Sequence, residues 1–314
     1  MNRASRGVLC VGLTALDVVH HLSGPPQWGY KQRSEGGELV AGGPAANASV
    51  TAARLLGSAR LLTAIGLSPP AGAVHADLAA HRVQVLDLAP AGWSVPVASA
   101  FVDVRTGERT VVSPGALGAG GVSGEGYSFA GLLDGMRAVL LDGHHPALAA
   151  RVAAEATAAE VPVLLDAGSW KDELDGVLPR VSVAACSADF RPPGQPRAGD
   201  DPLSVATVLH RRGVRTVLVT DGPRPVVWST MDGERGSVGV PEVRAVDTLG
   251  AGDVFHGALA AALASRWGSI TACAALAAEV AAARCATLGA RAWLDSPEVS
   301  ALAQRLRSRR PVAR

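Results

Sequence analysis

The chain of 314 residues has few aromatic residues, few charges and little sulfur. Aromatic residues make up 4% and charged residues 18% of it, whereas hydrophobic residues make up 48%. A chain this apolar can build a core, which excludes the disordered class of protein. The formal net charge is only +1. Without a basic excess or an acidic tail, we expect no nucleic-acid partner and no charged scaffold.

Cysteines are scarce and lie far apart. They form no CxxC pair, and they stand at positions 10, 186, 273 and 285. Isolated free thiols are typical of a reducing compartment, so we expect a cytoplasmic protein. The neighbouring His144 and His145 have no further ligands close in the sequence, and such pairs are more typical of a turn than of a metal site.

Long hydrophobic runs are also missing. No run approaches the ~18 apolar residues that a membrane span needs. The most apolar stretch, 269–288, is interrupted by Glu279 and Arg284, and the basic N-terminus reaches Asp17 before a signal-length apolar segment is complete. We therefore expect neither a membrane anchor nor a secretion signal.

What the chain does contain is a regular alternation of short apolar runs and helical patterns. Three of the runs end in an aspartate followed by a glycine one or two residues later, at Asp142, Asp166 and Asp221. Ligands of open α/β sheets bind at such strand ends, although Asp-Gly is also ordinary turn chemistry. The alternation predicts a parallel sheet covered by helices on both faces. The predicted strands are 7–19, 60–66, 137–143, 161–167, 181–187 and 216–222, and the predicted helices are 45–57, 71–82, 147–160, 202–213, 252–266, 269–288 and 296–308.

Two segments interrupt this alternation. Residues 24–40 are polar and rich in glycine, and residues 95–113 alternate around an Arg-Thr-Gly-Glu turn, which predicts a β-hairpin. We expect these segments to form a small β-sheet that acts as a lid on one domain spanning 1–314, since no linker or repeat divides the chain. Exposed strands in such a lid favour a homodimer.

Two glycine-rich loops each precede a predicted helix. In DTLGAGDVFHGA (247–258), the residues Gly250, Ala251 and Gly252 offer backbone N–H groups at the positive end of a helix, which favours a phosphate site. Asp253 would repel a bound phosphate, but it suits a general base that accepts the proton of an attacking hydroxyl. An acidic residue in a first helical turn can also be a simple helix start.

The other loop lies in AGGPAANAS (41–49). Gly42 and Gly43 let the backbone approach a ligand closely, and Pro44 can open a helix. Asn47 can both donate to and accept from a polyol, although an asparagine near a helix start is also a common cap. The chain contains neither GxxxxGK[ST] nor a GxGxxG after its first strand, which excludes the Walker and dinucleotide motifs.

Taken in order, these motifs resemble those of the ribokinase-like (pfkB) sugar kinases. DTLGAGDVFHGA is similar to the C-terminal motif of that family and GGPAANAS to its N-terminal motif, and the likeness covers residues 7 to about 295. Within the family, GYK, GERT and GAGDVFHGALA are most similar to the sulfofructose kinases, and DTLGAGD also resembles ketohexokinase. The resemblance implies a three-layer α/β/α core with a mostly parallel sheet and a small β lid. It also implies ATP as donor, Mg²⁺ as cofactor and, as in many relatives, a monovalent cation such as K⁺ near the glycine-rich loop that contains Gly250.

The resemblance further implies roles for individual residues. Asp253 becomes the general base, and Gly250, Ala251 and Gly252 become the anion hole. The residues implied to bind the sugar are Asp17, Lys31, Gly42, Gly43, Asn47, Arg109 and His144. The residues implied to bind the nucleotide and its metal ion are Asp189, Thr220, Gly222, Ala281 and Cys285.

Three positions depart from the family pattern. Cys186-Ser-Ala-Asp189 replaces the Asn-x-x-Glu motif that organises Mg²⁺, so Asp189 is expected to take part of that role. Pro225 replaces a glycine of the nucleotide loop, and His144 stands where the sulfofructose branch has an arginine. Sulfonated, phosphorylated and neutral ketoses all stay open as substrates. The alternatives are a nucleoside or vitamin-precursor kinase of the same fold, and a catalytically silent relative that binds nucleotide and sugar.

Overall fold

The computed structural model describes residues 7–115 and 122–308. The domain that we predict over 1–314 also includes residues 1–6, 116–121 and 309–314, which lie outside the described part of the chain. None of the described helices combines the length and the hydropathy that a bilayer crossing requires.

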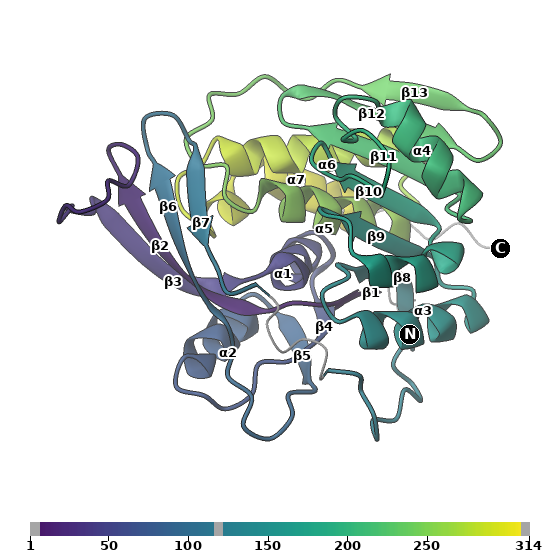
Figure 1. Ribbon diagram of the computed structural model, residues 1–314, viewed down its shortest axis with the longest axis horizontal. Coiled ribbons are helices and arrows are strands. Elements are labelled where there is room, and N and C mark those ends of the chain that lie inside the picture. The colour runs from purple at the N-terminus through teal and green to yellow at the C-terminus, as the bar shows by residue number, and fades with distance from the viewer. Residues whose placement is uncertain (1–6, 116–121, 309–314) are drawn as a thin grey trace.

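A nine-stranded sheet forms the middle layer of the molecule (Figure 1). Its order is β13-β12-β11-β10-β9-β8-β1-β4-β5, and the strands from β5 to β11 run parallel, whereas β12 and β13 are antiparallel. The strands are β1 (Gly7–Val11), β4 (Ala59–Thr63), β5 (Val83–Asp87), β8 (Met136–Leu141), β9 (Val163–Ala167), β10 (Val183–Ser187), β11 (Thr216–Asp221), β12 (Arg224–Thr230) and β13 (Arg235–Val238).

Helices cover both faces of this sheet. Strand β8 shows why its apolar run is continuous, because Ala138 and Leu140 face one core while Val139 and Leu141 face the other. One core contains α1 (Pro44–Leu56), α2 (Ala71–Ala80), α5 (Ala251–Ala264), α6 (Ile270–Cys285) and α7 (Pro297–Ser308). The other contains α3 (Pro146–Ala158) and α4 (Pro202–Arg211). The described chain also forms the short 3₁₀ helices η2 (Asp172–Gly176), η3 (Leu178–Arg180) and η4 (Ala292–Asp295). The predicted three-layer α/β fold is confirmed.

A second, four-stranded sheet stands at the left of Figure 1, outside the three layers. Its order is β3-β2-β6-β7, made of β3 (Gly36–Gly42), β2 (Ala15–Leu22), β6 (Val97–Asp103) and β7 (Arg109–Val112). The segment 95–113 therefore supplies two of its strands, and the segment 24–40 supplies most of a third. We call this four-stranded sheet the lid sheet.

The predicted single strand over 7–19 is wrong, because the chain changes sheets within it. Strand β1 ends at Val11 in the large sheet, and β2 begins at Ala15 in the lid sheet. At the break, Gly12 lies against the buried carboxylate of Asp142, so closely that a Cβ would stand 1.9 Å from Oδ1. Oδ2 of the same carboxylate accepts the N–H of Leu13 at 2.8 Å. The break is not visible in the sequence, because mostly apolar residues continue through it while the distant Asp142 side chain fixes the turn.

Candidate active site

Two helix N-termini meet beside the lid sheet. Gly43 precedes α1 and Gly250 precedes α5, and both adopt positive φ angles, 91° and 71°, which favour glycine. The two helices pack tightly, since a Cβ at Gly257 of α5 would lie 2.4 Å from the carbonyl oxygen of Ala48 in α1. This close packing brings the first turns of α1 and α5 together.

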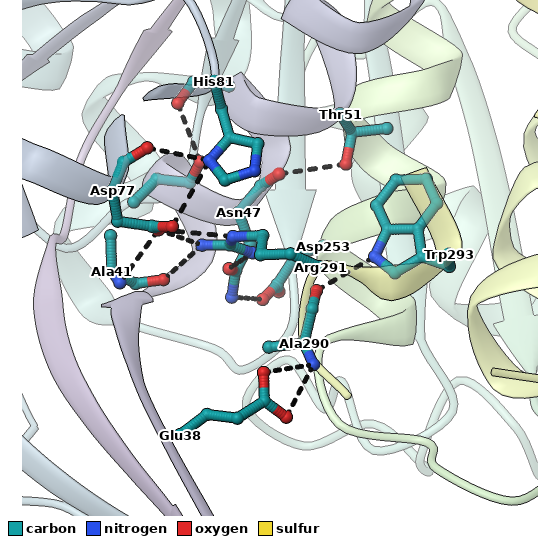
Figure 2. Close-up of polar contacts among 12 residues, drawn as sticks. Glu38, Ala41, Asn47, Thr51, Asp77, His81, Asp253, Ala290, Arg291 and Trp293 are labelled. Atoms are coloured by element: carbon teal, nitrogen blue, oxygen red, sulfur yellow. Dashed lines mark hydrogen bonds and ion pairs between the residues drawn. The ribbon is translucent and has the colours of Figure 1, made fainter. Parts of the chain in front are cut away.

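Asn47 and Asp253 join these first turns. Nδ2 of Asn47 donates a hydrogen bond to Oδ2 of Asp253 at 2.8 Å (Figure 2). Burial and, next, the negative charges of Asp166 and Asp17 raise the pKa of Asp253 to about 7, against the Asn47 hydrogen bond and the charge of His256. A carboxylate with a pKa near neutrality can exist unprotonated and still accept a proton efficiently, which is the property of a general base.

A buried ion pair lies behind Asp253. His256 follows one helical turn later, and its Nδ1 lies 3.1 Å from Oδ2 of Asp166 at the end of β9. Its Nε2 lies 3.2 Å from the carbonyl oxygen of Ala185. Burial alone would lower the pKa of His256, but the charge and hydrogen bond of Asp166 raise it. The aspartate that we predicted at a strand end thus shapes the field around Asp253.

The loop before Asp253 presents open backbone. Within the described chain, the N–H groups of Gly252 and Asp253 have no protein acceptor. A Cβ on Gly252 would meet nothing within 4 Å, so the space in front of this turn is free. Unsatisfied N–H groups at a helix start carry partial positive charge and attract anions. The geometry therefore places N–H groups of the kind that attract anions within one residue of the carboxylate.

The lid sheet contributes Asp17 from β2. Its carboxylate lies over Gly42, where a Cβ would come within 2.1 Å of it. Burial raises the pKa of Asp17 to about 6, although the charge of Arg291 opposes the shift. A small pocket lies between the lid sheet and the start of α5, and the residues lining it are Asp17, Val40, Asn47, Leu249, Gly250, Val254, Arg284, Ala290 and Arg291.

Arg291 is a part of the site that the sequence did not reveal. Its Nη1 donates to Oδ1 of Asn47 at 3.1 Å, which orients the amide so that Nδ2 faces Asp253. Its Nη2 pairs with Asp77 at 2.9 Å (Figure 2). Burial alone would raise the pKa of Asp77, but His81 and Arg291 lower it to about 2. Arg291 and Asp77 belong to no motif, so only the folded chain identifies them.

Three further residues that we predict to bind the sugar differ in their contacts with this centre. Arg109 of β7 reaches the glycine-rich loop, because its Nη1 donates to Oγ1 of Thr248 at 3.1 Å. Lys31 lies in the exposed loop between β2 and β3, and none of the described contacts links it to the pocket. His144 follows β8 and donates its backbone N–H to Asp142 at 2.9 Å. Their roles stay predictions.

The predicted nucleotide residues lie on two elements. Thr220 lies one residue before the end of β11, and its hydroxyl donates to the carbonyl oxygen of Cys186 at 3.3 Å. Gly222 follows the strand with φ 54° and open space around it. Ala281 and Cys285 lie on α6. Asp189 follows β10, is exposed, and pairs with Arg197. Pro225 is exposed and is the second residue of β12, just after the turn that follows β11.

The carbonyl oxygen of Cys285 connects α6 to the glycine-rich loop, since it accepts the N–H groups of Val246 and Asp247. Among the described residues, no group of three or more His, Cys, Asp or Glu side chains could by itself hold a metal ion.

Comparison with known families decides the class of protein. The model of the pfkB family carbohydrate kinases matches residues 5–297. This chain belongs to the pfkB family of carbohydrate kinases. It is thus a carbohydrate kinase, as the resemblance of its two glycine-rich motifs implies.

Solved structures agree with this membership. This kinase is 25% identical to a putative ribokinase from Agrobacterium tumefaciens, with a TM-score of 0.78 and coverage of 96% of this chain and 98% of that one. A ribokinase from Giardia lamblia shares the fold at 17% identity and a TM-score of 0.79, covering 95% and 99%. The Arabidopsis thaliana ribokinase complexed with ribose and ATP is 20% identical, with a TM-score of 0.71 and coverage of 96% and 98%.

Proposed function

We propose that this kinase transfers the γ-phosphoryl group of ATP to a hydroxyl of a sugar, a ketose or a related derivative. Asp253 acts as the general base, and Gly250, Ala251 and Gly252 form the anion hole. One observation carries the proposal: a carboxylate whose pKa is raised to about 7 adjoins N–H groups that have no acceptor in the described chain. Base and anion site thus share one helical turn.

The chemistry follows from this arrangement. The acceptor hydroxyl loses its proton to Asp253 while its oxygen forms a bond to the γ-phosphorus, and the bond from that phosphorus to the departing ADP oxygen breaks. The open N–H groups stabilise the negative charge of the transferring phosphoryl group. Asn47 holds Oδ2 of Asp253 in place, and Arg291 holds Asn47.

The pocket suits a polyol. Asp17 and Asn47 line it, and they offer an acceptor and an amide that both donates and accepts. Gly42, against the Asp17 carboxylate, and Gly43, before α1, are proposed to contribute backbone groups to the sugar site. Arg109, Lys31 and His144 are proposed to select the group at the far end of the sugar, whether neutral, phosphorylated or sulfonated. The motifs shared with sulfofructose kinases and ketohexokinase make a ketose our preferred acceptor.

ATP is proposed to lie along Thr220, Gly222, Ala281 and Cys285. Mg²⁺, when bound with the nucleotide, neutralises charge on its phosphates. A hydrated Mg²⁺ needs only one or two protein carboxylates beside the phosphates. Asp189 fits this need, since its exposed carboxylate is paired only with Arg197 among the described residues.

The proposal is tested by measuring ADP release with ketoses, aldoses including ribose, sugar phosphates, sulfosugars and nucleosides as acceptors. We expect the highest kcat/KM with a ketose or a ketose derivative. Preference for a nucleoside would favour the alternative kinase class. Binding of ATP without transfer to any acceptor would make the chain a silent relative.

We further propose a homodimer joined through the lid sheets. Val18 pairs across from Leu39 on β3 and across from Ser99 on β6, and Ser99 pairs across from Val112 on β7, so these residues share one face. Leu39 and Val112 on that face are 61% and 62% exposed. An apolar sheet face of this kind favours contact with a second copy.

A double variant, Leu39→Lys with Val112→Lys, is expected to sediment at the monomer mass of 31.9 kDa, and the wild type at about twice that mass, because two like charges on each face repel. Leu203→Lys on α4, a residue that is 50% exposed outside the lid sheet, is the matched control and should leave the dimer intact. A wild type that sediments as a monomer over the whole concentration range contradicts this proposal.

The cytoplasm is our proposed compartment. None of the four cysteines, all within the described residues, forms a disulfide, and Cys10, Cys186 and Cys273 are buried. Burial raises the pKa of the thiols of Cys10 and Cys186. Such thiols are inert and persist in a reducing compartment, where ATP is also at hand.

A further inference from the structure

Arg284 is a buried cation beside the glycine-rich loop 247–252, which we call the anion loop. Its side chain is 2% exposed, and its Nη2 lies 2.9 Å from Oδ2 of Asp247, which is 1% exposed. Its Nη1 lies 3.0 Å from the carbonyl oxygen of Thr287 and 3.3 Å from that of Asp247. One carboxylate and two backbone carbonyls therefore converge on a single positive charge.

The Asp247 carboxylate connects Arg284 to two neighbouring turns by hydrogen bonds. Its Oδ1 accepts the N–H of Leu249 at 2.9 Å, next to Gly250 of the anion loop. Its Oδ2 accepts the N–H of Gly289 at 3.2 Å, two residues before Arg291. The carboxylate is buried, and a buried negative charge that lacks a positive partner is costly. Arg284 supplies that partner from the last turn of α6, where a cation also complements the helix dipole.

The ligand set around Arg284 is of the kind that a monovalent cation uses. Carboxylate and backbone carbonyl oxygens bind K⁺ and similar ions when several of them point into one buried space. Here the guanidinium already occupies that space and satisfies those oxygens with donors from its own chain. A second cation would be repelled at this short range, because both charges would lie in a buried environment of low dielectric. The residues present therefore do not fit the K⁺ that the family resemblance implies.

We propose that Arg284 is a resident cation that replaces a monovalent ion, so that this kinase works without K⁺. Arg284 is a positioning residue, because it acts by holding Asp247 and hence the anion loop. The inference rests on the proposed function, because the loop that Arg284 supports is the proposed anion hole.

The first test compares the wild-type kinase in potassium chloride and in choline chloride at equal ionic strength. We expect the same kcat/KM and the same unfolding temperature in both salts. A rate that is about fivefold or more higher in K⁺, or an unfolding temperature that rises with K⁺ alone, overturns the proposal. The unfolding temperature needs no turnover, so it decides on the cation even if no acceptor in the panel is phosphorylated and the proposed function fails.

The second test makes the space accessible to an ion. Arg284→Met keeps an unbranched aliphatic side chain but removes the guanidinium and leaves Asp247 without its charge partner, so K⁺ is expected to raise its unfolding temperature and to increase its rate about fivefold or more over choline. Arg284→Lys keeps the charge and is expected to need no K⁺. Arg212→Met, which removes the partner of Asp175 in a surface ion pair, is the matched control without a cation response.

The outcomes separate cleanly. A folded Arg284→Met kinase that ignores K⁺ overturns the role of Arg284. An Arg284→Met chain that folds only in K⁺ supports it. If this variant folds in neither salt, the wild-type comparison decides alone.

Discussion

Replacing Asp253 by asparagine is expected to lower kcat by about 10³-fold, because a general base contributes roughly 10²–10⁴-fold to a proton transfer. Asparagine has the same shape and can still accept the hydrogen bond from Asn47, but it cannot take the proton of the acceptor hydroxyl. Binding of ATP should persist, since the N–H groups of the anion loop are unchanged. The measurements are steady-state kinetics and nucleotide titration.

The same substitution is expected to stabilise the fold at pH 8. The pKa of Asp253 rises from 3.8 to about 7 on folding, so the native chain binds the extra proton and its stability falls as the pH rises through that window. Above it, the buried carboxylate costs as much as ~4 kcal/mol, an upper bound from about three pKa units. Asp253→Asn removes this cost. The exposed Asp232→Asn is the control, with wild-type activity and stability expected. Full activity in Asp253→Asn would refute the proposed base.

The layers of the fold could be predicted because the apolar pattern is directly readable. Runs such as 137–143 and 161–167 are apolar on both faces, which is typical of the strands of a parallel sheet covered by helices. Strands β5, β12 and β13 were not predicted, because half-exposed residues break their apolar runs. The break between β1 and β2 was missed for the opposite reason, since apolar residues continue through it while Asp142 redirects the backbone.

The centre of the site could be predicted only where glycine marks it. Gly43 and Gly250 announce loops that precede helices, and they led to Asn47 and Asp253. No such signal accompanies Arg291, which reaches Asn47 across 244 positions of sequence. Nor does one accompany Arg284, which in an alanine-rich helix resembles a charge at a solvated face. Long-range ion pairs depend on packing, and a single sequence does not encode their partners in any local pattern.

The second large effect is a dependence of kcat/KM on pH. The free enzyme is active only when Asp253 is unprotonated, and its pKa is raised to about 7. We therefore expect kcat/KM to fall about tenfold for each pH unit below 7 and to level off above it. If Asp253 were instead a general acid, kcat/KM would fall as the pH rises above 7. Initial rates between pH 5 and pH 9, at one ionic strength, provide the profile.

A variant at Asn47 separates this titration from that of the nucleotide, whose terminal phosphate ionises with a pKa of about 6. The hydrogen bond from Asn47 lowers the pKa of Asp253, so Asn47→Leu, which keeps the size but removes the donor, should move the acid limb upward. A hydrogen bond to a charged group is worth roughly 1.5–3 kcal/mol, which corresponds to a shift of about one pH unit or more. The ionisation of ATP is the same with both proteins. A limb that stays in place in Asn47→Leu would therefore assign the titration to the nucleotide and remove Asp253 from the profile.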